Sequence, residues 1–226
     1  MTKKILIVAA HPDDEVLGCF GTVARLIEEG CEAYTLILGE GKTSRDDSRN
    51  AAAKKDEIAA LNNEMEQANS LIGIKKVFTA GLPDNRFDSV DLLDVVKAVI
   101  KVKDEIQPEV VFTHYANDLN VDHRVTYNAV LTACRPMESE TVKEIYSFEV
   151  LSSTEWNYPL SFSPDTYFDI SGTIAKKKEA MALYASEIRD FPHPRSVEGI
   201  ELNARWHGMR TGLAYAEAFK TVRVIR

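Results

Sequence analysis

The sequence predicts an α/β fold: a Rossmann-like, mostly parallel sheet flanked by helices, with its functional site at the carboxyl ends of the strands. Three observations lead to this prediction. The run from Lys4 to Ala10 is continuously apolar, as is typical of a strand buried on both faces of a parallel sheet. From Glu15 the apolar residues recur at helical spacing, and Gly30 follows where a helix would end. Strand-like and helix-like patterns then alternate as far as Ala133, and such alternation produces parallel strands covered by helices.

The same two patterns place the remaining elements along the chain. We expect strands at Ala33 to Leu38, Lys76 to Thr79, Val110 to Thr113, Lys143 to Phe148 and Tyr167 to Ile170. We expect helices at about Ala51 to Leu71, Val90 to Ile106, Val121 to Ala133 and Ala175 to Ser186. Pro192 and Pro194 break the pattern before a polar stretch to Gly212, and Ala214 to Val224 suits a closing helix or strand. Neither a repeat nor a low-complexity linker divides the chain, so we expect one domain over residues 1–226.

The composition is that of a globular protein, and it argues against nucleic acid as a partner. With 226 residues, of which 45% are apolar and 27% charged, the chain can bury a substantial core. A net charge of -8 disfavours binding to phosphate backbones, because such binding needs clustered Lys and Arg. The one basic triplet, Lys176 to Lys178, is interpreted as the solvated start of a helix.

The N-terminal apolar segment, Ile5 to Ala10, is too short for a signal-peptide core or a membrane span. We therefore expect a cytoplasmic protein without a membrane span. The three cysteines are odd in number and far apart, so they predict structural thiols rather than a disulfide framework or a thiolate zinc site. The loops near Asn157 to Pro164 and Phe191 to Ser196 suit a lid or a partner subunit, which leaves a homo-oligomer open.

Two loops at expected strand ends contain the residues that suggest chemistry. The first, Ala10 to Glu15, packs one histidine and three acids into the turn between the first strand and its helix. A dinucleotide-binding fold needs glycines there, so that its backbone can approach a pyrophosphate. This acidic loop would repel a phosphate unless a metal were present.

The second loop, His114 to Arg124, again combines histidines with acids. Catalytic zinc sites use three protein ligands, often histidine nitrogens and carboxylate oxygens, and keep a further position for water. His11 and an acid of the first loop can turn toward one point, and His123 can reach it from the second loop. On spacing alone either Asp13 or Asp14 could hold the metal, and the remaining carboxylate would be free to act as a general base. Iron could occupy the same ligand set.

A purely structural role for these acids is the alternative. Acids at a helix start stabilise its N-terminus, and Asp14 and Glu15 could serve only that purpose. However, the chain has five histidines, and two of them fall beside acids at the ends of two buried strands. This coincidence favours a shared metal site.

These residues resemble the PIG-L/LmbE-like family of zinc-dependent N-deacetylases. The family signature is an A-H-P-D-D loop after the first strand and a later Asp-His pair, here Asp122-His123. The resemblance implies that His11, Asp14 and His123 bind zinc, that Asp13 is the general base and that Asp122 orients the site. It also implies a substrate that is a small N-acetylated amino sugar or sugar conjugate, from which the acetyl group is removed.

One position departs from the family pattern. Many relatives have a histidine two positions before the Asp of the Asp-His pair, where this chain has Asn120. That histidine is thought to help stabilise the transition state, so its replacement has to come from elsewhere. His193, which lies between two prolines, is one candidate as the proton donor, and His114 is another.

Two further segments resemble the sugar-active branch of the family, Gly39 to Arg45 and Gly81 to Asp88, each directly after an expected strand. The candidate substrate-binding residues are Arg45, Arg49, Asp84, Arg86 and Asn120. Their side chains could hydrogen-bond sugar hydroxyls or pair with a phosphate, although Asp84 and Asn85 could equally be turn residues.

Two other functions compete with the deacetylase. The first is a metal-dependent phosphoesterase, which would need a second metal and a bridging carboxylate. The second is an α/β module that binds a ligand without catalysis.

Overall fold

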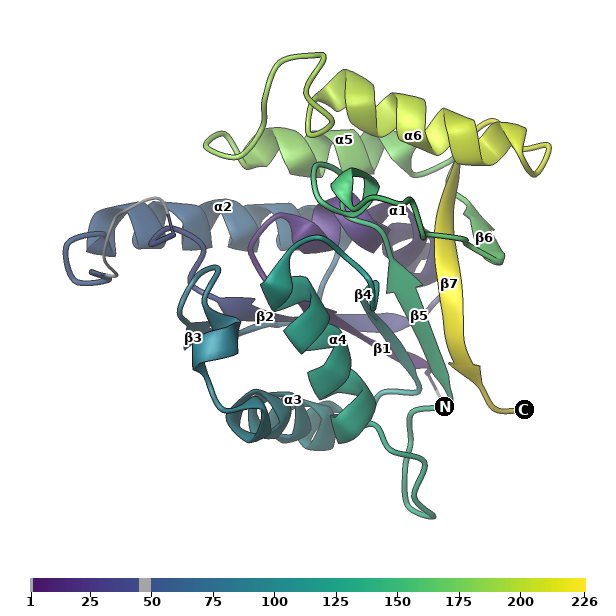
Figure 1. Ribbon diagram of the computed structural model, residues 1–226. Helices are drawn as coiled ribbons and strands as arrows, with labels where there is room; N and C mark the ends of the chain where they lie inside the picture. Colours follow the sequence, from purple (N-terminus) through teal and green to yellow (C-terminus); the bar gives the residue numbers. More distant parts are fainter. Residues whose placement is uncertain (1, 45–49) are drawn as a thin grey trace.

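Figure 1 shows a computed structural model of the chain, which describes residues 2–44 and 50–226. Within these residues the centre is a seven-stranded sheet in the order β3-β2-β1-β4-β5-β7-β6. The strands are β1 (Lys4–Ala9), β2 (Glu32–Gly39), β3 (Val77–Leu82), β4 (Val110–His114), β5 (Glu144–Phe148), β6 (Thr166–Asp169) and β7 (Ala216–Val224). Strands β1 to β5 pair in parallel, whereas β7 is antiparallel to β5 and β6. The predicted α/β fold with a mostly parallel sheet is confirmed.

Helices cover both faces of the sheet (Figure 1). They are α1 (Asp14–Glu28), α2 (Lys55–Ile72), α3 (Leu92–Ile106), α4 (Val121–Ala133), α5 (Ile174–Leu183) and α6 (Val197–Met209). Helices α1, α2 and α5 pack in the core of one face, and α3 and α4 in the core of the other. Short 3₁₀ helices, η1 (Phe87–Ser89) and η2 (Thr154–Trp156), lie in two of the loops. Among the helices described, none is both long enough and apolar enough to cross a bilayer.

Strand β1 lies at the centre because its side chains are apolar on both faces. Ile5 and Ile7 pack in the core beneath α1, α2 and α5, whereas Leu6 and Val8 pack in the core beneath α3 and α4. All four are fully buried. Because burying an aliphatic side chain of this size contributes about 1.5–3 kcal/mol, a position at the sheet edge would lose much of that stabilisation.

The structure corrects several expected elements. The helix expected from Ala51 begins at Lys55, and the segment Ala214 to Val224, left open before, forms strand β7. The stretch expected to be irregular and polar before Gly212 contains helix α6. The side chain of Ser196 caps α6 by accepting a hydrogen bond from the backbone N–H of Gly199 at 2.9 Å. Several large apolar residues of α6 face solvent, which hides the helical period in the sequence.

The basic triplet Lys176 to Lys178 was expected to be solvated, but its middle residue is not. Lys177 is buried, and its Nζ lies 2.5 Å from Glu217 Oε1 and donates to the carbonyl of Leu17 at 2.8 Å. Glu217 also accepts hydrogen bonds from the backbone N–H groups of Gly21 and Thr22, at 2.9 and 2.7 Å. This ion pair therefore joins α5 and β7 to the middle of α1.

The strand order places the candidate site. Strand β1 lies between β2 and β4, so the chain leaves β1 toward one side of the sheet and later returns on the other side. At such a switch point the loops that follow the two central strands diverge and leave a crevice in which ligands bind. Here these are residues 10–13, after β1, and residues 115–120, after β4.

Candidate active site

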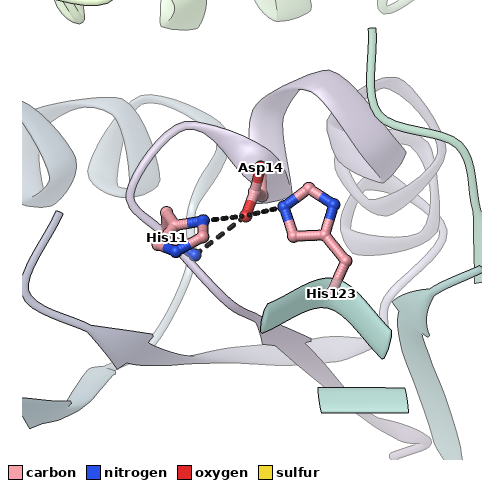
Figure 2. A group of neighbouring side chains, drawn as sticks. All are labelled: His11, Asp14 and His123. Carbon is pink, nitrogen blue, oxygen red and sulfur yellow. Dashed lines mark hydrogen bonds and ion pairs between the residues drawn. The ribbon is translucent and has the colours of Figure 1, made fainter. Parts of the chain in front are cut away.

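One carboxylate oxygen of Asp14 is the meeting point of the two loops. Asp14 Oδ2 lies 3.4 Å from His11 Nδ1 and 3.3 Å from His123 Nε2 (Figure 2). The backbone N–H of His11 donates to the same oxygen at 2.8 Å. His11 follows β1, Asp14 opens α1 and His123 lies in the first turn of α4, so three segments converge on one point. One donor atom from each of the three residues lies within 4.8 Å of the others.

Each histidine has a second carboxylate behind its ring. His11 Nε2 lies 2.9 Å from Asp122 Oδ2, and His123 Nδ1 lies 3.0 Å from Asp118 Oδ1. Carboxylates in this position fix the tautomer and orientation of metal-binding histidines. The pairing leaves Nδ1 of His11 and Nε2 of His123 directed at Asp14. Asp118 was not singled out from the sequence, although the need of each histidine for an acidic partner was a signal that could have found it.

Both partner carboxylates are themselves held in place. Asp122 is fully buried, and its Oδ1 accepts a hydrogen bond from the backbone N–H of Phe87 at 2.9 Å. Asp118 accepts hydrogen bonds from the hydroxyls of Ser153 and Thr154. Burial by itself would raise the pKa of Asp118, but these bonds and His123 lower it to about 2. His123 therefore has a fixed, ionised partner in Asp118, and His11 has a fixed, buried partner in Asp122.

The cluster fits a divalent cation. Burial lowers the pKa of His123, but Asp14 and Asp118 overcome this effect and raise the pKa to about 9. Burial also acts against protonation of His11, yet Asp122 and Asp14 raise its pKa well above the usual value. Both pKa shifts report a negative potential at the point where the ring nitrogens meet. Two imidazole nitrogens and one carboxylate are also the donor set of many catalytic zinc sites.

His114 lies beside the cluster and is held in the neutral form. Its Nε2 accepts a hydrogen bond from the backbone N–H of Ala10 at 2.8 Å, so the proton of the neutral ring is on Nδ1. Its ring stacks on His123 with centroids 4.0 Å apart, and Phe148 packs against its edge. Burial and the neighbouring His123 lower the pKa of His114 well below the usual value. These contacts favour a packing role over the proton-donor role considered from the sequence.

Asp13 is an acid of the first loop that lies outside the cluster of His11, Asp14 and His123. Its backbone is left-handed, with φ of 106°, and its N–H donates to Glu15 Oε2 at 3.0 Å. Its Oδ2 lies 3.0 Å from the guanidinium of Arg195, which the sequence did not single out. Burial and the adjacent Asp14 raise the pKa of Asp13 well above its usual value, and Arg195 opposes that rise. A carboxylate with a raised pKa, held beside the cluster, is suited to accept a proton.

A pocket of about 250 Å³ opens over the cluster. Besides the three clustered residues, its lining includes Asp13, Asp84, Asn85, Asn120, Glu187 and Arg195. Asp84 Oδ1 also lies 3.4 Å from His11 Nε2. Of the predicted substrate-binding residues, Asp84 and Asn120 therefore line the pocket. Arg86 is not among the lining residues, and Arg45 and Arg49 lie outside the described residues.

Asn120, at the position where many relatives have histidine, has a structural function here. It is the N-cap of α4, and its side-chain oxygen accepts from the backbone N–H of Asp122 at 2.8 Å. Its amide nitrogen donates to Asn85 Oδ1 at 2.8 Å, which ties the loop after β3 to the loop after β4. This residue can thus present an amide to the pocket, but it cannot exchange a proton as an imidazole would.

His193 is in the loop between α5 and α6, and it lies outside the residues that line the pocket. Its Nδ1 accepts a hydrogen bond from the backbone N–H of Arg195 at 3.1 Å, and its ring contacts Trp156 with centroids 5.8 Å apart. This loop does reach the pocket, but through Arg195. A role of His193 in proton donation stays a prediction.

These features define a class of protein: an α/β enzyme with a candidate metal centre at the switch point of its sheet. A family model described as PIG-L, GlcNAc-PI de-N-acetylase, matches residues 6–134. The chain therefore belongs to the PIG-L family, as its resemblance implied, and is a deacetylase.

Individual proteins agree with this assignment. The chain is 26% identical over 192 residues to a probable N-acetyl-alpha-D-glucosaminyl L-malate deacetylase 2 from Bacillus cereus, which covers 83% of this chain and 84% of that protein. It is 23% identical over 228 residues to a diacetylchitobiose deacetylase from Thermococcus kodakarensis, covering 97% and 83%. A crystal structure of a conserved protein from Thermus thermophilus shares the fold, with a TM-score of 0.79, 23% identity and coverage of 100% and 97%.

Proposed function

We propose that the protein is a zinc-dependent hydrolase that removes the acetyl group from an N-acetylated amino sugar or sugar conjugate. The observation that supports it best is the position of Asp13, a carboxylate outside the cluster of His11, Asp14 and His123 that lines the same pocket. The names of the two relatives support the acetylated sugar as the substrate class.

His11 Nδ1, Asp14 Oδ2 and His123 Nε2 would hold the metal. A bound divalent ion lowers the pKa of water and polarises an acyl carbonyl, which is the chemistry that amide hydrolysis needs. Asp13 accepts the proton of the attacking water and delivers it to the leaving amine. Arg195 keeps the Asp13 carboxylate directed toward the pocket through the contact of 3.0 Å.

The rest of the pocket favours hydroxyl groups over phosphate. Asp84, Asn85 and Asn120 offer carboxylate and amide groups along the wall, and these groups hydrogen-bond sugar hydroxyls. A phosphate would meet Asp13, Asp84 and other acids at short range, which weighs against the phosphoesterase. Substrate contacts from Arg45, Arg49 and Arg86 remain part of the prediction.

The proposal is tested by acetate release from N-acetylated monosaccharides, oligosaccharides and nucleotide sugars, with metal-loaded and chelated protein. Loss of a general base costs a factor of about 10² to 10⁴ in rate, so Asp13→Asn is expected to lose activity by that factor while it retains metal. Asp94→Asn, an exposed acid on α3, is the matched control. Metal-loaded protein that releases no acetate from any sugar would favour the binding module, and hydrolysis of phosphate esters with two metal ions per chain would favour the phosphoesterase.

A further inference from the structure

The loop that follows β5 contacts the carboxylate behind one of the clustered histidines. The hydroxyls of Ser153 and Thr154 donate to Asp118, one to each carboxylate oxygen. Asp118 Oδ1 in turn lies 3.0 Å from His123 Nδ1, the ring nitrogen that faces away from Asp14. Two hydroxyls that are 35 and 36 positions from Asp118 in sequence are therefore connected to the histidine ring through a single carboxylate.

These hydrogen bonds are withdrawn from solvent. Asp118 is fully buried, and Ser153 and Thr154 are also buried. A buried carboxylate needs hydrogen-bond donors from the protein, because water cannot solvate its charge. Asp118 Oδ1 also accepts from the backbone N–H of Asn120 at 2.8 Å. That donor belongs to the same loop as Asp118, whereas the two hydroxyls hold the carboxylate from the end of a different strand.

The loop after β5 presents its hydroxyls in a fixed conformation. The carboxylate of Glu155 accepts from the backbone N–H groups of the two residues before Thr154, at 2.6 and 3.2 Å. Thr154 Oγ1 accepts from the backbone N–H of Val150 at 2.8 Å. Because a hydroxyl has one proton, the proton of Thr154 is then directed at Asp118.

The same loop is anchored on α6 and lines the first pocket. Glu149 Oε1 accepts a hydrogen bond from Asn203 Nδ2 at 3.1 Å and lies 2.5 Å from His207 Nε2. Val150 and Ser153 line the pocket over the cluster. In Figure 1 the loop lies between β5 and α6. Contacts on a helix late in the chain therefore hold a loop that reaches the surroundings of the candidate metal centre.

Strand β5 also supports His123 by packing. Phe148, the last residue of β5, packs against the His114 ring with centroids 4.9 Å apart, and His114 stacks on His123 with centroids 4.0 Å apart. Stacking limits the plane of the His123 ring, but it does not select which ring nitrogen faces Asp14. The proximity of Nδ1 to the Asp118 carboxylate does select it, because Nε2 is then the nitrogen directed at Asp14.

We propose that Ser153 and Thr154 are positioning residues of the metal centre, which hold the Asp118 carboxylate so that His123 directs Nε2 at a divalent ion. The proposal rests on the metal-dependent function proposed above. Removal of either hydroxyl leaves the three ligand residues in place but lets the carboxylate move away from Nδ1. Binding of the ion must then also restore the orientation of the ring, which lowers the affinity.

Zinc dissociation constants, measured by competition with a chromophoric chelator, test this proposal. Ser153→Ala and Thr154→Val should each raise the constant about 3- to 10-fold, the range that corresponds to one hydrogen bond. Thr154→Ser keeps the hydroxyl and should bind zinc as the unmodified protein does. Thr173→Val is the matched control, because Thr173 is also buried and its hydroxyl donates to the carbonyl of Gly21 at 2.7 Å. Its dissociation constant should be unchanged.

A double-mutant cycle separates positioning from a general loss of structure. Asp118→Asn has no carboxylate for the hydroxyls to hold, so the addition of Ser153→Ala should change its zinc dissociation constant by less than a factor of about two. Urea denaturation first shows that each chelated variant is folded, and Ser153→Ala carries the test if Thr154→Val does not fold. An equal effect of Ser153→Ala with and without Asp118→Asn would mean that this hydroxyl does not act through Asp118, and the proposal would be wrong.

The outcomes distinguish this proposal from the deacetylase function. If no sugar releases acetate but both hydroxyls still control zinc affinity, the deacetylase function fails and the positioning role stands. If acetate is released while Ser153→Ala and Thr154→Val bind zinc as tightly as the unmodified protein, the function stands and the positioning role is wrong. If the unmodified protein binds no divalent ion, both proposals are wrong.

Discussion

Arg195 holds Asp13: the guanidinium of a residue near the end of the chain lies 3.0 Å from a carboxylate of the first loop. Glu187, which is also buried, lies 3.6 Å from the same guanidinium, and Lys42 lies 2.6 Å from Glu187. Charges of alternating sign thus connect the loops after β2 and α5 to the first loop. The arrangement keeps the Asp13 carboxylate directed at the pocket. Burial and Asp14 raise the pKa of this carboxylate, and Arg195 opposes that rise.

Removing this guanidinium is expected to reduce the rate without removing the metal. Because a hydrogen bond to a charged group contributes about 1.5–3 kcal/mol, Arg195→Ala should lower kcat/KM about 10- to 100-fold. Arg195→Lys should recover part of that loss, because it restores the charge but not the planar donor geometry. Steady-state kinetics with metal analysis checks this expectation, and Arg205→Ala, at an exposed position on α6, is the control. Full activity in Arg195→Ala would show that Asp13 needs no support from this loop.

A second expected effect concerns Glu15, which holds the backbone of Asp13. Glu15 is fully buried and accepts from Asp13 N–H at 3.0 Å, from Tyr184 Oη at 2.5 Å and from Asn69 Nδ2 at 3.1 Å. Burial raises its pKa to about 7. In Glu15→Gln the new NH₂ group must face one of these donors, which leaves a buried donor unsatisfied.

We expect Glu15→Gln to lower the free energy of unfolding by about 1–3 kcal/mol, measured by urea denaturation. When the NH₂ group takes the place of Oε2, Asp13 N–H loses its acceptor, and kcat should then fall more than KM rises. Tyr184→Phe, which removes one donor and leaves Asp13 N–H bonded, should affect stability more than kcat. Glu28→Gln, on the exposed surface of the same helix, is the control for both measurements. An unchanged kcat in Glu15→Gln would show that the reaction does not depend on the hydrogen bond between Asp13 N–H and Glu15.

Much of the fold and part of the site follow from local sequence. The apolar run of β1 fixes a central strand, and parallel strands bring the loops that carry His11 and His123 to the same edge of the sheet. The proximity of these two histidines and Asp14 could therefore be predicted, because each of the three residues follows shortly after the end of β1 or β4. The proposed roles of the residues rest instead on the family resemblance.

Contacts between distant segments could not be predicted in this way. Arg195 reaches Asp13 across 182 positions of sequence, and only packing of the α5–α6 loop over the pocket brings them together. Helix α6 itself was missed because Leu202, Trp206 and Met209 are exposed, so apolar residues do not mark its buried face. Lys177 was expected to be solvated because local sequence gives no sign of its partner. That partner, Glu217, is on strand β7, far along the chain.

The carboxylates behind the histidines should control metal affinity. Asp118 and Asp122 lie 3.0 and 2.9 Å from the ring nitrogens of His123 and His11 that face away from Asp14. Because loss of such a partner typically weakens metal binding by a factor of about 10 to 100, Asp118→Asn and Asp122→Asn should each raise the zinc dissociation constant by that factor. Competition with a chromophoric chelator measures it, and one ion per chain is expected in the unmodified protein. Asp165→Asn, an acid on the exposed surface, should leave the affinity unchanged.

Asp118 should also make the stability of the metal-free protein depend on pH. Burial alone would raise its pKa, but His123 and the hydroxyls of Ser153 and Thr154 lower it from 3.8 to about 2. A carboxylate whose pKa is lower in the folded state stabilises that state above its unfolded pKa, and the stabilisation is lost as the pH falls through the folded pKa. The contribution, about 2 kcal/mol, should therefore be complete above pH of about 5 and disappear between about pH 4 and 2.

Urea denaturation of chelated protein from pH 6 to 2 measures this dependence, with the range chosen from the two pKa values. Asp118→Asn cannot titrate at this position, so its free energy of unfolding should fall less steeply than that of the unmodified protein below about pH 4. Asp88→Asn, with an exposed side chain, should follow the unmodified protein throughout. The difference between the unmodified and Asp118→Asn curves isolates this one carboxylate, because the other acids titrate in both. Parallel curves over the whole range would mean that Asp118 is not held ionised by His123 and its two hydroxyl donors.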